Sequence, residues 1–202
     1  MERDLFSLLQ FLNIQKTYVM GLSMGGSLSV DFTLQYPGMV DALITVGAGL
    51  SGFEEDDPEE FKAKNEEMQE AFMRGDIARS VEISLQMWTD GPFRTPEQVN
   101  PQVRERVRAM TTHNLERGDD EEVQPQHIET PAAGRLSEIQ VPTLIIVGGE
   151  DVEFILTIAD KLERDIVGAK KVVIPGTAHH LNMEKPQEFN RVVIDFLKQV
   201  GK

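Results

Sequence analysis

A serine flanked by glycines is the feature of this chain best suited to chemistry. Residues 21–26 read Gly-Leu-Ser-Met-Gly-Gly, which places Ser23 at the centre of a Gly-x-Ser-x-Gly motif. The apolar run at 17–20 predicts a buried strand before it, and residues 27–35 predict a helix after it. A serine at such a sharp turn is held with its hydroxyl clear of the sheet. Ser23 is therefore the candidate nucleophile of an acyl-transfer reaction.

The neighbours of Ser23 have physical roles in this motif. We expect a side chain at Gly21 or Gly25 to collide with the adjoining strand or helix. The backbone N–H of Met24 and the positive end of the helix are aimed at the place where a carbonyl oxygen would become negative. Met24 is thus the candidate donor for half of an oxyanion hole. The alternative interpretation is a glycine-rich turn with an incidental serine.

Two later loops carry a candidate acid and a candidate base. Glu150 and Asp151 follow a strand expected at 142–148, and His179 and His180 follow a strand expected at 171–174. The carboxyl ends of parallel strands share one edge of a sheet, so we expect these loops to converge on Ser23.

Spacing selects one residue in each loop. The Val-Gly-x-x-Asp spacing from Val147 favours Asp151 over Glu150, and the Gly-x-x-His spacing from Gly176 favours His179 over His180. The order of serine, then acid, then histidine along the chain is that of a known triad arrangement. The other histidines, His113 and His127, are interpreted as surface or cap residues without a catalytic role.

The remaining pattern predicts an α/β fold, a mostly parallel sheet flanked by helices, with a helical cap inserted into it. A second strand is expected at 41–47, and helices are expected at 153–166 and 186–200. Between them, residues 53–135 show helix starts and apolar spacing without a convincing strand. We therefore divide the chain into a core of residues 1–52 and 136–202 and a cap of residues 53–135. Four leucines at helical spacing near the start predict an amphipathic helix packed on the sheet: Leu5, Leu8, Leu9 and Leu12.

Composition limits the classes of protein that remain. The chain has 202 residues, 40% of them hydrophobic, which suits one domain with an insertion. It has no cysteine, which excludes disulfides and thiolate metal sites. The first residues are charged and form too short an apolar run for a membrane span. A cytoplasmic location is the expectation that follows.

The negative charge is concentrated in the predicted cap. Residues 53–135 contain 20 acidic and 10 basic side chains, and the whole chain has a net charge of -14. Such a field disfavours nucleic acids and anionic membranes as partners, and it slows the approach of strongly anionic substrates. A small-molecule substrate is the expected partner. The alternative is that the charge serves only to keep the surface solvated.

An apolar substrate pocket is one use for side chains near the serine and in the cap. We consider Leu22 next to the serine, together with Met87, Trp88 and Phe93 from the cap, as its candidate lining. The competing interpretation is that the methionines and aromatic residues of the cap pack it onto the core, because stripes at helical spacing usually do.

From Leu8 to Phe196 the chain resembles the α/β-hydrolase family, particularly its small-substrate esterase and enol-lactonase-like branch. The resemblance is carried by GLSMGG at 21–26, VPTLIIVGGED at 141–151 and PGTAHHLNMEKPQEFN at 175–190. It implies that Ser23 is the nucleophile, Asp151 the triad acid and His179 the base, with the Met24 N–H in the oxyanion hole. A serine at this position points away from the dehalogenases and epoxide hydrolases of the family, which have an aspartate there.

These roles define an expected function. His179 would take the proton of Ser23 as the serine attacks a carbonyl, Asp151 would orient the imidazole, and water would release the acyl-enzyme. The expectation is a serine-dependent hydrolase of small esters, lactones or related carbonyl compounds that needs no metal or organic cofactor.

The resemblance also implies four strands and a helix before Glu2, with a strand-end loop that provides the second oxyanion N–H. The sequence begins without them, so we expect a shortened fold with the strand at 17–20 as an open edge, where two copies could pair. Losing one oxyanion donor typically lowers the rate by about 10² to 10³. The alternative function is therefore a catalytically impaired relative that binds a ligand or partner through its cap and open edge.

Overall fold

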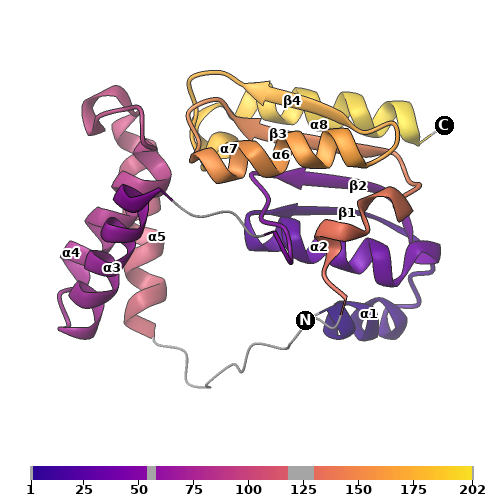
Figure 1. Cartoon of the computed structure of the whole chain (residues 1–202), viewed down its shortest axis with the longest axis horizontal. Coiled ribbons are helices and arrows are strands. Elements are labelled where there is room, and N and C mark those ends of the chain that lie inside the picture. The colour runs from indigo at the N-terminus through magenta and orange to yellow at the C-terminus, as the bar shows by residue number, and fades with distance from the viewer. Residues whose placement is uncertain (1, 54–57, 118–129, 202) are drawn as a thin grey trace.

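The centre of the computed structural model is a parallel sheet with the strand order β1-β2-β3-β4 (Figure 1). The structure describes residues 2–53, 58–117 and 130–201. The strands are β1 (Thr17–Leu22), β2 (Val40–Val46), β3 (Thr143–Gly148) and β4 (Lys170–Ile174). All three neighbouring pairs run parallel. The three loops that carry the candidate residues therefore leave the sheet at the same edge.

The burial of each strand follows from its place in the sheet. The central strands β2 and β3 are almost continuously apolar, and every residue of β3 is buried, because helices cover both faces. The outer strand β1 is more accessible, with Tyr18 45% and Met20 54% exposed. Within the described residues β1 pairs on one side, with β2.

Two layers of helices sandwich the sheet. Helices α2 (Met24–Gln35) and α6 (Glu153–Asp165) pack on one face, where Val30, Leu43 and Ile145 belong to one buried cluster. Helix α8 (Pro186–Val200) covers the other face together with the short helix α7 (Leu181–Glu184). The apolar face of α8 is predictable from sequence, because its buried residues recur at helical spacing: Phe189, Val193 and Phe196.

Helix α1 (Glu2–Phe11) lies against α2, and its buried face belongs to a cluster that also contains Val19 of β1 and Val40 of β2. Leu9 is its buried residue and packs in a cluster with Phe32, while the ring of Phe6 stacks on Tyr36 with centroids 4.4 Å apart. Leu8 and Leu12 are each 52% exposed. The predicted helix is therefore present, but only part of its apolar stripe is covered.

The predicted cap contains α3 (Glu59–Met73), α4 (Ile77–Ser84) and α5 (Pro101–Arg117), which Figure 1 shows as a bundle set apart from the sheet and its flanking helices. Helix α4 continues into a π-helical turn, η2 (Leu85–Asp90). On α3 the buried residue is Ala71, whereas Phe72 and Met73 of the expected apolar face are 45% and 76% exposed. His127 lies outside the described residues.

Short helical turns complete the chain: η1 (Pro37–Met39) before β2, η3 (Pro96–Gln98) before α5, and η4 (Ala132–Gly134) and η5 (Leu136–Glu138) before β3. The Ser51 hydroxyl donates to Asp31 Oδ1 at 2.6 Å and accepts from the Ala132 N–H at 2.9 Å. Burial raises the pKa of the Asp31 carboxyl above its usual value. This contact fastens the start of η4, where the chain re-enters the core, to α2.

Candidate active site

The elbow at Ser23 has the strained backbone that its motif predicts. Ser23 has φ 56° and ψ -120°, one of two positive φ angles among the described non-glycine residues. It sits directly between the end of β1 and the start of α2, and its N–H donates to the Val46 carbonyl at 2.9 Å. A non-glycine residue holds such a conformation only when its surroundings enforce it. The hydrogen bond to the end of β2 is part of that enforcement.

The glycines around the elbow differ in their roles. A Cβ at Gly21 would lie 2.0 Å from the Gly25 carbonyl oxygen, so Gly21 is required for the close approach of strand and helix. A Cβ at Gly25 would meet nothing within 4 Å, and the collision expected there was wrong. The crowded helical position is Gly26, where a Cβ would lie 2.5 Å from that of Ala48. The reason is that Gly26, one residue further along α2, faces the loop after β2.

Asp151 and His179 form a buried pair at the ends of β3 and β4. The Nδ1 atom of His179 lies 3.0 Å from Asp151 Oδ2 and 3.3 Å from Oδ1. Their side chains are 6% and 1% exposed, and the Val152 N–H donates to Asp151 Oδ1 at 2.9 Å. Because a carboxylate only accepts, His179 carries its proton on Nδ1 in this contact. Its Nε2 is then free to accept a proton from another group.

Gly47, at the end of β2, connects this pair to the elbow. A Cβ at Gly47 would lie 3.2 Å from His179 Nδ1 and 3.4 Å from Asp151 Oδ2, and its φ is +47°. The preceding residue, Val46, accepts the Ser23 N–H. The ends of all four strands thus meet around one point. No hydrogen bond joins the Ser23 hydroxyl to His179, both of which are described; such catalytic bonds often close only when substrate is bound.

Met24 is the first residue of α2, so its N–H has no acceptor within the helix. Its side chain is 69% exposed. The positive end of the α2 dipole therefore opens toward solvent beside Ser23, as an oxyanion donor requires.

The two rival residues have other partners. The ring of His180 lies with Nδ1 3.2 Å from the Thr89 hydroxyl, and burial followed by the neighbouring His179 lowers its pKa to about 4. Glu150 joins the two loops through its backbone, since its N–H donates to the Thr177 carbonyl at 2.8 Å. Among the described contacts, the acid that reaches the imidazole of His179 is Asp151.

The candidate pocket residues lie in different surroundings. Trp88 is half-buried, and its ring lies against that of His179 with centroids 4.7 Å apart. Leu22, beside Ser23, is also half-buried, whereas Met87 is 3% exposed and Phe93 is 63% exposed. Of the three cap residues considered, Trp88 is the one in contact with a triad candidate.

The matched family model is the alpha/beta hydrolase fold, and it covers residues 1–186. The chain belongs to this family. The parallel sheet, the serine elbow and the acid and histidine at later strand ends are the parts of the α/β-hydrolase fold present here.

Two curated relatives of this chain are named as hydrolases. The 2-hydroxy-6-oxononadienedioate/2-hydroxy-6-oxononatrienedioate hydrolase of Escherichia coli K12 is 28% identical over 204 residues, which cover 96% of this chain and 67% of the relative. The 2-hydroxy-6-oxo-6-phenylhexa-2,4-dienoate hydrolase of Comamonas testosteroni is 26% identical, with coverages of 98% and 68%. A crystal structure of a hydrolase from Pseudomonas aeruginosa PA01 matches with a TM-score of 0.72 and 25% identity, over 97% of this chain and 70% of that one.

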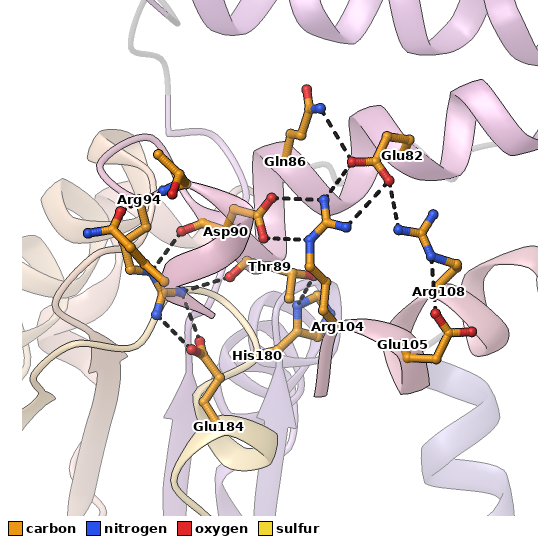
Figure 2. A network of polar contacts seen from close by, with 12 residues as sticks. Glu82, Gln86, Thr89, Asp90, Arg94, Arg104, Glu105, Arg108, His180 and Glu184 are labelled. Carbon is orange, nitrogen blue, oxygen red and sulfur yellow. Dashed lines mark hydrogen bonds and ion pairs between the residues drawn. The ribbon is translucent and has the colours of Figure 1, made fainter. Parts of the chain in front are cut away.

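A polar network that joins the helical segment 77–108 to residues 176–184 was not predicted from the sequence (Figure 2). Arg94 and Glu184, which are far apart in the chain, form an ion pair with Nη1 and Oε2 2.7 Å apart. Arg104 contacts both Asp90 and Glu82. Sequence offers only a weak signal for these partners, because arginine and glutamate are common on solvated helices and their pairing depends on how the cap folds back.

Two hollows on the described surface lie away from the triad candidates. One is lined by Leu144, Lys170 and Arg191 among others, at the start of β4 and beside α8. The other lies along the start of α8. The triad candidates follow the carboxyl ends of the strands, which is where ligands of open α/β sheets bind. We therefore assign the site by its chemistry. No helix among the described residues is long and apolar enough to span a membrane.

Proposed function

We propose that this hydrolase cleaves small uncharged esters or lactones through an acyl-enzyme on Ser23, with His179 as base and Asp151 as the acid that orients it. The observation that carries the proposal is the buried Nδ1 contact of His179 with Asp151 at 3.0 Å. It fixes the tautomer that leaves Nε2 available to the serine. A histidine with a purely structural role does not require a buried carboxylate partner at the sheet edge where the strained residue Ser23 also lies.

The reaction follows from what each group can do near neutral pH. His179 Nε2 takes the proton of the Ser23 hydroxyl as Oγ attacks the carbonyl carbon, and Asp151 stabilises the imidazolium that forms. The Met24 N–H donates to the oxyanion. The imidazolium then protonates the leaving alcohol. Water repeats the sequence to release the acid and free Ser23.

The preference for uncharged substrates is inferred from Arg94, which contacts the loop that carries His179, residues 175–180. Arg94 uses all five of its N–H groups: two on Glu184, and one each on the carbonyls of Thr89, Asp90 and Gly176. It therefore has no donor left for a substrate carboxylate. The relatives named above act, by name, on dienoates and dienedioates; we expect this chain to differ from them.

Aromatic side chains support an apolar acyl group. Trp88 makes edge contacts with Phe61 of α3 and Phe154 of α6, with ring centroids 5.5 Å and 6.1 Å apart. All three rings are half-buried, and Trp88 also touches His179. Such a wall next to the base favours a substrate whose acyl or alkoxy part is apolar.

A fluorophosphonate probe tests the proposal directly, because it reacts with activated serines. We expect the purified chain to be labelled at Ser23, Ser23→Ala to be unlabelled, and Asp151→Asn to react about 10³ to 10⁴ times more slowly, since the histidine loses its orienting acid. Ser51→Ala is the control, because Ser51 bonds Asp31 and has no place in the mechanism; it should label like the parent. Folded parent protein that stays unlabelled would contradict the proposal and favour a non-catalytic binding protein.

A further inference from the structure

The Arg94–Glu184 pair is buried where the cap meets the core. The two side chains are 9% and 6% exposed, and two hydrogen bonds of 2.7 and 3.1 Å join the guanidinium to the carboxylate. Figure 2 shows the pair with Arg94 on the cap segment and Glu184 on the segment after the histidine loop. Replacing a buried pair by apolar residues is often neutral or even stabilising. Stability alone is thus a weak explanation for these two charges.

Both members of the pair bind the loop that carries His179. Glu184 Oε1 accepts from the Ala178 N–H at 2.8 Å, and Arg94 Nη1 donates to the Gly176 carbonyl at 2.9 Å. Ala178 directly precedes His179 in the chain. The pair therefore fixes the backbone through which the imidazole is placed against Asp151.

The same arginine binds the cap turn η2. Its Nε donates to the Asp90 carbonyl at 2.8 Å, and Nη2 donates to the Thr89 carbonyl at 2.7 Å. The neighbouring carbonyl, that of Trp88, accepts the N–H of His179 at 3.1 Å. The position of the base therefore depends on the position of η2, and Arg94 holds the two together.

We propose that Arg94 and Glu184 are positioning residues that set the orientation of His179 by joining the cap turn to the histidine loop. This inference rests on the proposed role of His179 as the base. A displacement of about 1 Å at a reacting group can lower a rate by about 10². Because the Arg94–Glu184 pair bonds the backbone of both η2 and the loop before His179, it limits displacements of the His179 imidazole of that size.

Two conservative variants and a matched control test the proposal. Glu184→Gln keeps an oxygen for the Ala178 N–H but removes the charge, and Arg94→Lys keeps the charge but removes the planar fork that reaches five acceptors. The control is Glu82→Gln, which removes the charge of a carboxylate that binds Arg104 at 2.6 Å and Arg108 at 2.7 Å and that forms no hydrogen bond or ion pair with residues 175–184 among those described. The double variant Arg94→Gln/Glu184→Gln leaves no unpaired charge and serves if a single variant fails to fold.

The first measurement separates kinact from KI for a fluorophosphonate, well below each variant's Tm. We expect the pair variants to lower kinact by about 10- to 100-fold with KI within about threefold, because the base moves while the substrate wall stays. Glu82→Gln should lower Tm and keep the parental kinact. Pair variants with parental kinact, or a control that loses kinact as they do, would overturn the proposal.

The second measurement does not depend on catalysis. The His179 Nδ1–H bonded to Asp151 should give a downfield proton NMR signal in the parent, identified by its loss in Asp151→Asn. We expect this signal to shift or broaden in the pair variants and to stay unchanged in Glu82→Gln. If the parent has the signal but is not labelled, the proposed function fails while the positioning role is still tested. An unchanged signal in folded pair variants would refute the positioning role.

Discussion

At the scale of single residues, two adjacent histidines have opposite environments. The Nδ1 atom of His179 contacts the Asp151 carboxylate, whereas His180 is buried beside Thr89 and His179, and these surroundings lower the pKa of His180 to about 4. A base must accept a proton near neutral pH, so His180 is unsuited to that role. The Gly-x-x-His spacing selected the right member of the pair for contact with Asp151, although it contains no information about the other.

The low pKa of His180 predicts a loss of stability in mild acid. The unfolded chain takes up a proton near the usual 6.5, while the folded chain keeps this imidazole neutral down to about 4. Between these values the unfolded chain binds more protons, so the free energy of unfolding decreases as the pH falls from about 6.5 to about 4, by about 2 to 4 kcal/mol.

His180→Asn can keep a polar atom near Thr89 but does not titrate, so we expect it to remove that part of the pH dependence. Urea unfolding at a series of pH values measures the effect. His113→Asn, on the exposed surface of α5, is the control and should follow the parent. Parallel curves for His180→Asn and the parent would show that His180 is not the group responsible.

At the scale of elements, the end of β2 is the junction of the site. Val46 bonds the Ser23 N–H, and Gly47 leaves room for the imidazole and the carboxylate. The apolar run of β2 predicts the strand, but the need for a glycine after it depends on side chains from β3 and β4 that arrive more than a hundred residues later.

Gly47→Ala should therefore slow catalysis by more than its loss of folding stability accounts for. The added Cβ would lie 3.2 Å from the His179 ring, and φ +47° adds backbone strain of about 1 to 2 kcal/mol. Gly168→Ala is the matched control, because Gly168 has φ +75° and open space around it. Both variants should lose stability in urea unfolding, but only Gly47→Ala should slow fluorophosphonate labelling, by about tenfold or more. Equal labelling rates in the two variants would contradict this role of Gly47.

Strands and helices could be predicted from the sequence to within a few residues, because the buried runs of β2 and β3 and the spacing in α8 are strong signals. The exceptions have tertiary causes. The π-helical geometry of η2 is not predicted from the sequence, and it occurs where the carbonyls of η2 bind Arg94 and the N–H of His179. The partial burial of α1 likewise depends on which neighbours cover it. The division into core and cap remains a prediction.

At the scale of the whole molecule, the chain has a net charge of -14, and the negative charge is concentrated in residues 53–135 of the sequence. Residues 53–135 contain twice as many acidic as basic side chains. Many of the described cations there are already bound to carboxylates: Lys64 to Glu60, Arg74 to Glu70, Arg79 to Glu67 and Arg104 to Glu82. With its net charge of -14, the molecule as a whole repels an anionic substrate more than a neutral one.

This field predicts that salt changes the selectivity for charged esters. Raising NaCl from about 0.02 to about 0.2 M shortens the Debye length from roughly 20 to 7 Å and screens the repulsion. We expect kcat/KM for mono-p-nitrophenyl succinate, which is anionic, to rise several-fold, and that for p-nitrophenyl butyrate, which is neutral and of similar size, to stay within about twofold. Initial rates at fixed pH measure both. A fall for the anionic ester would indicate a cation that binds its carboxylate.

The hydrogen bond from the His179 N–H to the Trp88 carbonyl couples the access of substrate to the site with the orientation of the base. If the cap swings outward to admit a substrate or release a product, it takes this acceptor away from the base. In the open molecule, water reaches the site and His179 is not held in its reactive orientation. In the closed molecule, His179 is held in that orientation and the cap shields the site from bulk water. Substrate entry and the chemical step would alternate within each turnover, because both depend on whether the Trp88 carbonyl accepts the His179 N–H.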